Sequence, residues 1–165
     1  MKLSRLMPIL AICALISFSS CSSESLNEEE SINLDLVVAP QAKPLELEIL
    51  ELINYHRITN GMNALNSNDT VKAVAYTHTD YMVEVDDVSH ANFFERKQSL
   101  QNNENAQIVS ENVAYGFTSA ESVVNAWINS PSHRSNIEGN YTHFDISAEK
   151  NEEGDWYFTN IFIKK

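Results

Sequence analysis

Residues 124–137 read VNAWINSPSHRSNI, and this stretch decides how the second half of the chain folds. Its first part belongs to an apolar stripe at helical spacing, which Pro131 ends because proline lacks the backbone N–H that a continuing helix needs. Ser130 before Pro131 is also typical of the cap and first position of a new helix. The sequence therefore predicts two consecutive helices, with His133 in the first turn of the second. The stripe of the first one contains Ala120, Val123, Val124, Trp127 and Ile128.

Two longer helices are expected upstream of this stretch. The first begins near Leu45 and ends before Gly61, which suits a left-handed C-terminal cap. The second follows a cap at Ser67 or Asn68. Its inner face is marked by mostly apolar residues at steps of three and four. This face must pack against another element. These residues are Val71, Val74, Ala75, His78, Tyr81, Met82 and Val85.

A loop and a buried extended segment separate the second helix from the third. Residues 86–107 are expected to form the loop, with a short turn of helix at 93–96. Residues 108–115 are largely apolar and end at Gly116, which predicts a buried strand. The string TSAE at 118–121 is a capping-box pattern for the helix that follows.

The C-terminal part is rich in residues that favour strands. Phe144, Ile146 and Ala148 alternate with polar residues, a turn is expected around Gly154, and residues 156–163 are dense in aromatic and β-branched side chains. This pattern predicts an antiparallel hairpin. Helices first and strands last, with one strand between them, predict an α+β domain with α/β/α layers.

The first 20 residues have the pattern of a bacterial export signal. Lys2 and Arg5 give a basic start, and the 13 residues 6–18 are almost wholly apolar. This run is shorter than the roughly 20 residues that a membrane-spanning helix needs. The string FSSC at 18–21 resembles a lipobox, in which the cysteine receives acyl chains such as palmitate and becomes the first residue. An ordinary cleaved signal that ends near a cysteine is the alternative.

The processed chain would be acidic and free of disulfides. Without the two basic residues of the signal it keeps 9 basic and 23 acidic residues, a net charge of −14. This charge argues against nucleic acid as a partner. It suits divalent cations, cationic peptides or neutral ligands, and the alternative is that it serves only to keep the domain soluble. With Cys21 lipidated, no other cysteine remains, so the domain depends on its hydrophobic core. Residues 21–44 are polar, acidic and closed by Pro40 and Pro44, which is typical of a flexible tether.

The chain lacks the common motifs of nucleophilic and nucleotide chemistry. G-x-S-x-G, the P-loop, H-E-x-x-H and the dinucleotide-binding glycine pattern are all absent from the sequence. Five histidines remain. His78 lies on the apolar face of the second helix and His56 ends that of the first, so both are expected in structural roles. His143 opens a strand and could face either way.

His90 and His133 are better placed for chemistry. His90 lies in a loop and His133 at a helix start, positions that often display functional side chains. Glu111 is a carboxylate on an apolar segment, and it needs a partner because an unpaired buried charge is costly. If the three converge, they could be ligands of an open zinc site, an acid–base cluster or a hydrogen-bond network that holds loops together. Spacing alone leaves these alternatives open.

Four strings of the chain resemble those of the bacterial CAP superfamily, whose domain is also called the SCP-like extracellular domain. INYHR at 53–57 resembles the family's VNxHR, and Ser89-His90 resembles its SH loop. SENVAYG at 110–116 resembles GENIAYG, and residues 124–137 resemble VxxWxxSPGHRxNIL. Their order and spacing match from residue 45 to the end. This resemblance implies a CAP domain at 45–165, and the export and tether patterns described above predict a signal peptide at 1–20 and a lipidated tether at 21–44 before it.

The resemblance implies an α-β-α sandwich with a three-stranded antiparallel sheet between helical layers. It also implies a central cleft that holds two histidines and two acidic residues. His90, Glu111 and His133 match three of these positions by motif, and Ser130 stands at the fourth, so the set is incomplete. Asn112, Ser130 and Arg134 are expected to line the cleft.

The resemblance leaves the activity open, because family members are described as binding sterols, fatty acids or divalent metals, and proteolysis has been proposed for a few. We expect a non-catalytic envelope module, held to the membrane through Cys21, whose cleft binds an apolar small molecule, a cell-wall component or a protein. Zinc or magnesium at His90, His133 and Glu111 is part of this expectation. One alternative is a metal-assisted hydrolase of a peptide, ester or wall substrate, with Glu111 as general base. Another is a structural or adhesive surface protein. A monomer on the periplasmic or surface side is expected.

Overall fold

A computed structural model of the chain describes residues 38–165. The expected signal peptide, Cys21 and most of the expected tether lie outside these residues. In the described part, no helix has the length and apolar character needed to cross a membrane. The helices are α1 (Pro44–Thr59), α2 (Asp69–Val85), α3 (Phe93–Glu104), α4 (Ala120–Asn129) and α5 (Pro131–Ile137). The strands are β1 (Asn66–Ser67), β2 (Ile108–Tyr115), β3 (His143–Lys150) and β4 (Trp156–Lys164).

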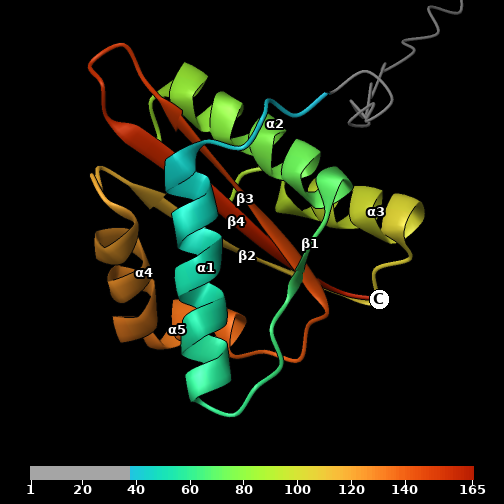
Figure 1. Cartoon of the computed structure of the whole chain (residues 1–165). Coiled ribbons are helices and arrows are strands. Elements are labelled where there is room, and N and C mark those ends of the chain that lie inside the picture. The colour runs from blue at the N-terminus through green and yellow to red at the C-terminus, as the bar shows by residue number, and fades with distance from the viewer. Residues whose placement is uncertain (1–37) are drawn as a thin grey trace, which may run out of the picture.

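The sheet lies between two layers of helices. α1, α4 and α5 cover one face, and α2 and α3 cover the other (Figure 1). The strand order is β1-β3-β4-β2, with β4 antiparallel to both of its neighbours. The predicted α+β sandwich is thus confirmed.

The three-stranded antiparallel sheet implied by the resemblance needs one correction. A fourth strand, β1, has only two residues and pairs in parallel with the start of β3. Two residues are too few to show the alternation by which strands are recognised in a sequence. The strand matters for the architecture because it leads directly into α2 and forms one edge of the sheet.

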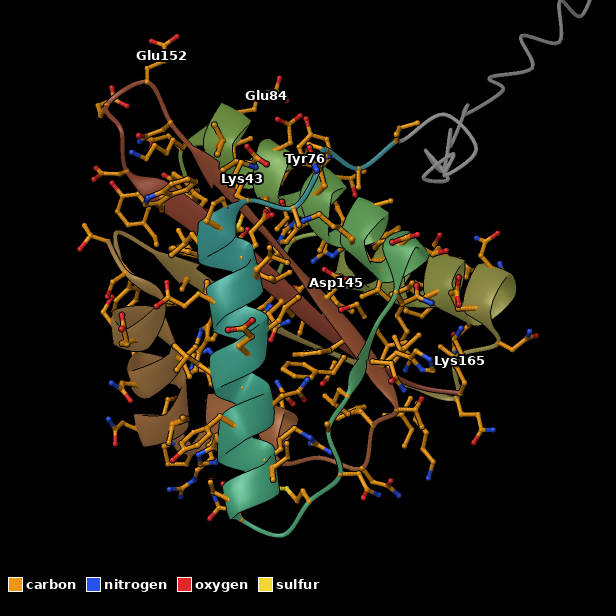
Figure 2. All side chains as sticks on the ribbon, viewed as in Figure 1. Lys43, Tyr76, Glu84, Asp145, Glu152 and Lys165 are labelled. Atoms are coloured by element: carbon orange, nitrogen blue, oxygen red, sulfur yellow. The ribbon has the colours of Figure 1, made fainter. Side chains whose placement is uncertain are left out.

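Each face of the sheet has its own hydrophobic core. Phe144, Ile146 and Ala148 of β3 point to the same core as residues of α1, α4 and α5. Asp145 and Ser147 alternate with them and therefore face α2. The predicted hairpin is confirmed, and Glu152 in its turn and Lys165 after β4 mark its two ends (Figure 2). The core under α2 and α3 contains Val71, Val74, Ala75, Leu100, Ala106, Val109, Ile161 and Ile163.

The ends of α1 and α2 confirm two predicted caps. Gly61 has a φ of +78°, its N–H donates to Ile58 at 3.0 Å, and the next N–H donates to Arg57 at 2.9 Å. These two bonds form the motif in which a left-handed glycine closes a helix. At the start of α2, the side chain of Asn68 accepts from the N–H of Val71 at 2.8 Å. Asn68, rather than Ser67, is therefore the cap.

Two helix boundaries differ from the prediction. α3 has 12 residues, whereas the sequence predicts only a short turn of helix. The full helix is not predicted because its inner face buries only Arg96 and Leu100 and shows little apolar periodicity. The cap of α4 is Ser119, whose side chain bonds Ser122, so the capping box lies one residue later than predicted. Pro131 is at the first position of α5 as predicted, although the Ser130 side chain at its cap makes no capping bond.

Candidate functional site at the β2 edge

The predicted site residues come from elements that meet at β2, an edge strand of the sheet. Glu111 pairs in register with Ile161, a residue of the core under α2 and α3, so its side chain faces those helices. His90 belongs to the segment between α2 and α3. His133 lies in the first turn of α5, as predicted, and its carbonyl accepts the amide of Asn112 at 3.1 Å.

The Glu111 carboxylate is the centre of this arrangement. Its side chain is 1% exposed. Arg96 of α3 donates from Nε to one oxygen and from Nη2 to the other, each at 2.8 Å. The Nδ1 of His90 lies 2.8 Å from the second oxygen. The predicted need of this carboxylate for a partner is therefore met, and both of its oxygens are used.

These bonds hold the Glu111 carboxylate in its ionised form and orient the ring of His90. Burial acts to raise the pKa of the Glu111 carboxyl, but hydrogen bonds from His90 and Arg96 and the charge of Arg96 outweigh it, and the pKa lies below its usual value. An ionised carboxylate only accepts hydrogen bonds, so the Nδ1 of His90 carries a proton. The other ring nitrogen, Nε2, belongs to a side chain that is 52% exposed.

His78 lies behind this cluster on α2 and has the structural role that the sequence predicts. The residue is 2% exposed, and its Nε2 donates to the carbonyl of Ser89 at 2.8 Å. Burial lowers the pKa of its imidazole, and the charge of Arg96 lowers it further. A neutral His78 thus ties α2 to the residue before His90 and holds the loop in place.

His133 completes the arrangement from the other side of the β2 edge. Burial lowers the pKa of its imidazole, and the charge of the nearby His90 adds to this effect. The ring is therefore neutral at pH 7. The structure thus brings His90 and Glu111 into contact and places His133 within electrostatic reach of His90.

The three residues predicted to line the cleft have different positions. Asn112 is fully buried, and its side-chain oxygen accepts the amide of Asn136 at 2.8 Å, so it holds α5 against β2. The Oγ atoms of Ser130 and Ser132 lie 3.3 Å apart at the start of α5. Arg134 is exposed on the same helix.

The side chains of His90, Glu111 and His133 are not arranged as a set of metal ligands in this structure. No group of three or more histidine, cysteine, aspartate or glutamate side chains among residues 38–165 is arranged to hold an ion. Arg96 and His90 occupy the oxygens that Glu111 would offer, and the nearby guanidinium repels a cation. Metal binding by His90, His133 and Glu111 therefore stays a prediction.

Sequence reasoning missed Arg96 and Asn136, the residues that organise the site. Arg96 is 2% exposed and also donates to the carbonyl of Ala91 at 2.6 Å. One feature of the sequence could have indicated that Arg96 is buried. Phe93, Arg96 and Leu100 are spaced at steps of three and four, so they share one face of a helix. A charged residue at an inner position implies a buried partner of opposite charge, and Glu111 is that partner.

The other two histidines lie away from this cluster. His56 of α1 lies 2.9 Å from a carboxylate oxygen of Glu138, just after α5, and its structural role stays a prediction. His143 is half-buried at the start of β3, with Nδ1 2.9 Å from the hydroxyl of Thr142.

Arg57 is buried and donates to the carbonyl of Gly139 at 2.9 Å, which supports the turn after α5.

Comparison with known proteins identifies the domain. The model of the CAP family, described as the cysteine-rich secretory protein family, matches residues 50–162. The chain is 29% identical over 124 residues to the uncharacterized membrane protein YlbC of Bacillus subtilis, which covers 73% of this chain and 34% of that protein. It is 25% identical over 127 residues to the uncharacterized protein YkwD of the same species, covering 71% and 47%. The chain thus spans less than half the length of either relative.

Solved structures share the fold. An outer surface protein of Borrelia burgdorferi superposes with a TM-score of 0.65 at 24% identity, covering 71% of this chain and 90% of that one. An extracellular protein of Bacillus anthracis that contains an SCP domain gives a TM-score of 0.61 at 22% identity, covering 76% and 45%. At these identities the likeness establishes the arrangement of helices and strands.

Proposed function

The chain belongs to the CAP family, and on that premise we propose that it is a non-catalytic binding module of the cell envelope, with His90 and His133 as its recognition residues. The observation that carries this proposal is the engagement of Glu111 by Arg96 and His90. A general base must be able to take a proton, but the pKa of this carboxyl is lowered and both of its oxygens accept hydrogen bonds. Glu111 acts instead as a support that orients His90.

The imidazoles of His90 and His133 suit the recognition of a polar ligand group. His90 presents Nε2 on a half-exposed side chain, and a bond to the buried Glu111–Arg96 ion pair fixes the orientation of its ring. His133 is neutral at pH 7 and offers a second donor and acceptor. Fixing the His90 ring before binding lowers the entropy that association costs. The ligand we propose is a wall-derived fragment, a peptide or a small molecule that carries a hydroxyl or amide group.

The proposal includes the location of the module. The relatives include a protein named as an outer surface protein and one named as extracellular, and the start of the chain has the pattern of a lipoprotein signal. We propose that Cys21 carries the lipid that holds the domain at the membrane. The variant Cys21→Ser should leave the membrane fraction or remain unprocessed. A variant that is cleaved and stays in the membrane would rule out this anchor.

The binding proposal is tested by nuclear magnetic resonance of the imidazole rings. Muropeptides, short peptides and fatty acids are titrated into the full chain, and the ring signals of His90 and His133 are followed. A saturable shift of both signals that persists in His143→Ala supports the proposal, provided that the shift of the His133 signal is lost in His90→Ala. It is abandoned if no class shifts these rings, or if any of the compounds is converted to product.

A further inference from the structure

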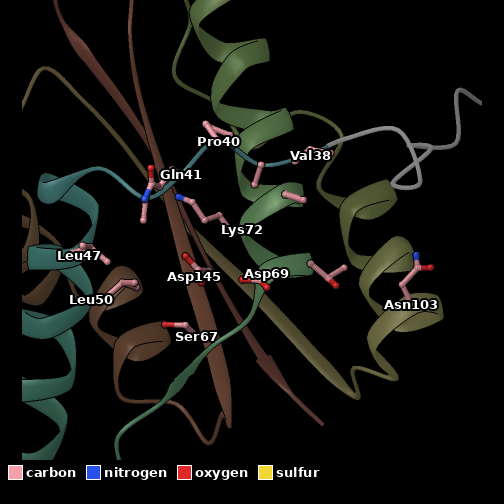
Figure 3. Close-up of a pocket in the computed structure, with 14 residues that line it drawn as sticks. Val38, Pro40, Gln41, Leu47, Leu50, Ser67, Asp69, Lys72, Asn103 and Asp145 are labelled. Carbon is pink, nitrogen blue, oxygen red and sulfur yellow. The ribbon is translucent and has the colours of Figure 1, made fainter.

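A second site candidate lies at the opposite edge of the sheet, next to β1 and β3. A partly open cavity of about 760 Å³ is lined there by the segment before α1, by α1 itself, by the start of α2 and by β3, with one residue each from β1 and α3 (Figure 3). Sites for small molecules typically have volumes of roughly 300–1,000 Å³. The histidine cluster contributes no residue to this cavity, so the two sites are separate.

The walls of the cavity divide into an apolar part and a polar part. Pro40, Leu47, Leu50 and Ala73 supply aliphatic surface. The polar lining residues are Gln41, Ser67, Asp69, Thr70, Lys72, Asn103 and Asp145. Figure 3 shows Leu47 and Leu50 on α1, and Asp69 and Lys72 on α2, around this space. A ligand that fits these walls has one polar end and a short aliphatic body.

Asp145 is the buried charge of this cavity. The residue is 4% exposed, and Figure 2 shows it between α1 and α2. Its carboxylate accepts the N–H of Ile146 at 2.9 Å and that of Asn68 at 3.2 Å. Within residues 38–165 no cationic side chain is hydrogen-bonded to it. Burial raises the pKa of this carboxyl to about 6, which is the mark of a charge that lacks a direct counterion.

Lys72 lines the same cavity, but its charge is already used. Its Nζ donates to a carboxylate oxygen of Glu46 at 2.9 Å and to the carbonyl of Ile146 at 3.0 Å. Glu104 of α3, which bonds the neighbouring Asn68, is itself paired with Lys165. The charges that remain for a ligand are those of Asp69 and Asp145.

We propose that this cavity binds a small aliphatic amine, with its ammonium group on Asp145 and Asp69 and its hydrocarbon part against Leu47, Leu50 and Ala73. A cation restores the pairing that the buried carboxylate lacks, and the apolar walls cover the chain that carries it. A metal ion is the weaker occupant, because no cluster of three acidic or histidine side chains is arranged for one among residues 38–165. The net charge of −12 over the whole chain also attracts cations to the surface.

The probe is hexylammonium, with hexanol as a neutral molecule of the same length. Each is titrated into the full chain at pH 7.5 while the amide resonances of Leu50, Ala73 and Asp145 are recorded. Hexylammonium should shift these resonances saturably, and hexanol should bind at least tenfold more weakly. At pH 5 the affinity for hexylammonium should fall several-fold, because Asp145 is then largely protonated.

Two variants and a matched control complete the experiment. Asp145→Asn should weaken binding at least tenfold and remove its pH dependence, whereas Glu153→Gln deletes one carboxylate from the exposed turn and should change nothing. If Asp145→Asn does not fold, the proposal is tested with Asp69→Asn, which changes an exposed residue. We expect this variant to bind hexylammonium at least threefold more weakly than the native chain. The proposal is overturned if hexylammonium gives no saturable shift, if hexanol binds as well, or if the deciding variant binds like the native chain. None of these outcomes involves His90, so the proposed function is tested separately.

Discussion

Arg96 on α3 and Glu111 on β2 form a buried two-bond ion pair, with both N···O distances at 2.8 Å. The two side chains are 2% and 1% exposed. Together with the apolar contacts of Leu100, this pair holds α3 and the loop before it against the edge of the sheet. Because His90 bonds the same carboxylate, the position of the exposed imidazole depends on this buried pair.

Breaking this pair should be costly for stability. Arg96→Met leaves the Glu111 carboxylate buried without its guanidinium, and we expect a loss of about 3–5 kcal/mol in the free energy of unfolding. Urea denaturation followed by circular dichroism measures it. Lys97→Met, one residue further along α3, removes the same charge from a partly exposed position and should cost about 1 kcal/mol or less. The double variant with Glu111→Leu should recover much of the loss, and a strictly additive result would contradict the pairing.

The same pair also predicts how the site responds to zinc. The guanidinium occupies the carboxylate oxygens that a metal would need, so the native chain should bind zinc weakly, through its histidines alone. Arg96→Gln frees Glu111, and we expect zinc affinity to rise at least tenfold in calorimetric titration. His133→Ala in the same background should remove the gain. Tight binding of one zinc ion by the native chain would show that Arg96 gives way to metal.

Sequence reasoning identified the parts of the site that follow from local chemistry. His90 and His133 were found because a loop and a helix start display their side chains, and Glu111 because a carboxylate on an apolar strand needs a partner. The partner itself was not found. Arg96 lies 15 residues away on a helix whose buried face has little apolar periodicity, so only the tertiary arrangement brings it to Glu111.

The fold shows the same division. α1, α2 and α4 follow from their apolar faces, and the β3–β4 hairpin follows from its alternation. β1 was missed, because its two residues are exposed and owe their strand geometry to pairing with β3. The cavity beside it was missed for a related reason, since its walls come from segments far apart in the sequence.

A second buried ion pair joins the two helical layers. Glu46 of α1 is fully buried, accepts the ammonium of Lys72 on α2 at 2.9 Å and accepts the N–H of Ala148 at 2.8 Å. Glu46→Gln keeps the shape but removes the charge, so Lys72 is left buried without its partner. We expect a loss of about 3–5 kcal/mol in unfolding free energy. Glu48→Gln, exposed on the same helix, should change it by no more than about 0.5 kcal/mol. Equal effects of the two substitutions would contradict this role.

Asp145 should give the protein an unusual dependence of stability on pH. The pKa of its carboxyl is raised from 3.8 to about 6 in the folded chain, chiefly by burial, with Lys72 lowering it and Glu46 raising it. The folded state therefore binds a proton more tightly than the unfolded state between about pH 4 and pH 6, and stability falls as the pH rises through this window. Glu111 acts in the opposite direction, because its pKa is lowered and its contribution is lost as the pH falls through the folded value.

The contribution of Asp145 is isolated by comparison with Asp145→Asn. A difference of about two pKa units corresponds to on the order of 2–3 kcal/mol, which is the upper limit of the effect. We expect the native chain to gain stability relative to Asp145→Asn as the pH is lowered from 7 to 4.5, measured as the change in urea-unfolding free energy at each pH. Asp80→Asn, exposed on α2, should show no such gain. A constant difference between the native chain and Asp145→Asn over this range would mean that the buried carboxylate already has a counterion at neutral pH, and an ammonium ligand would then have little to add.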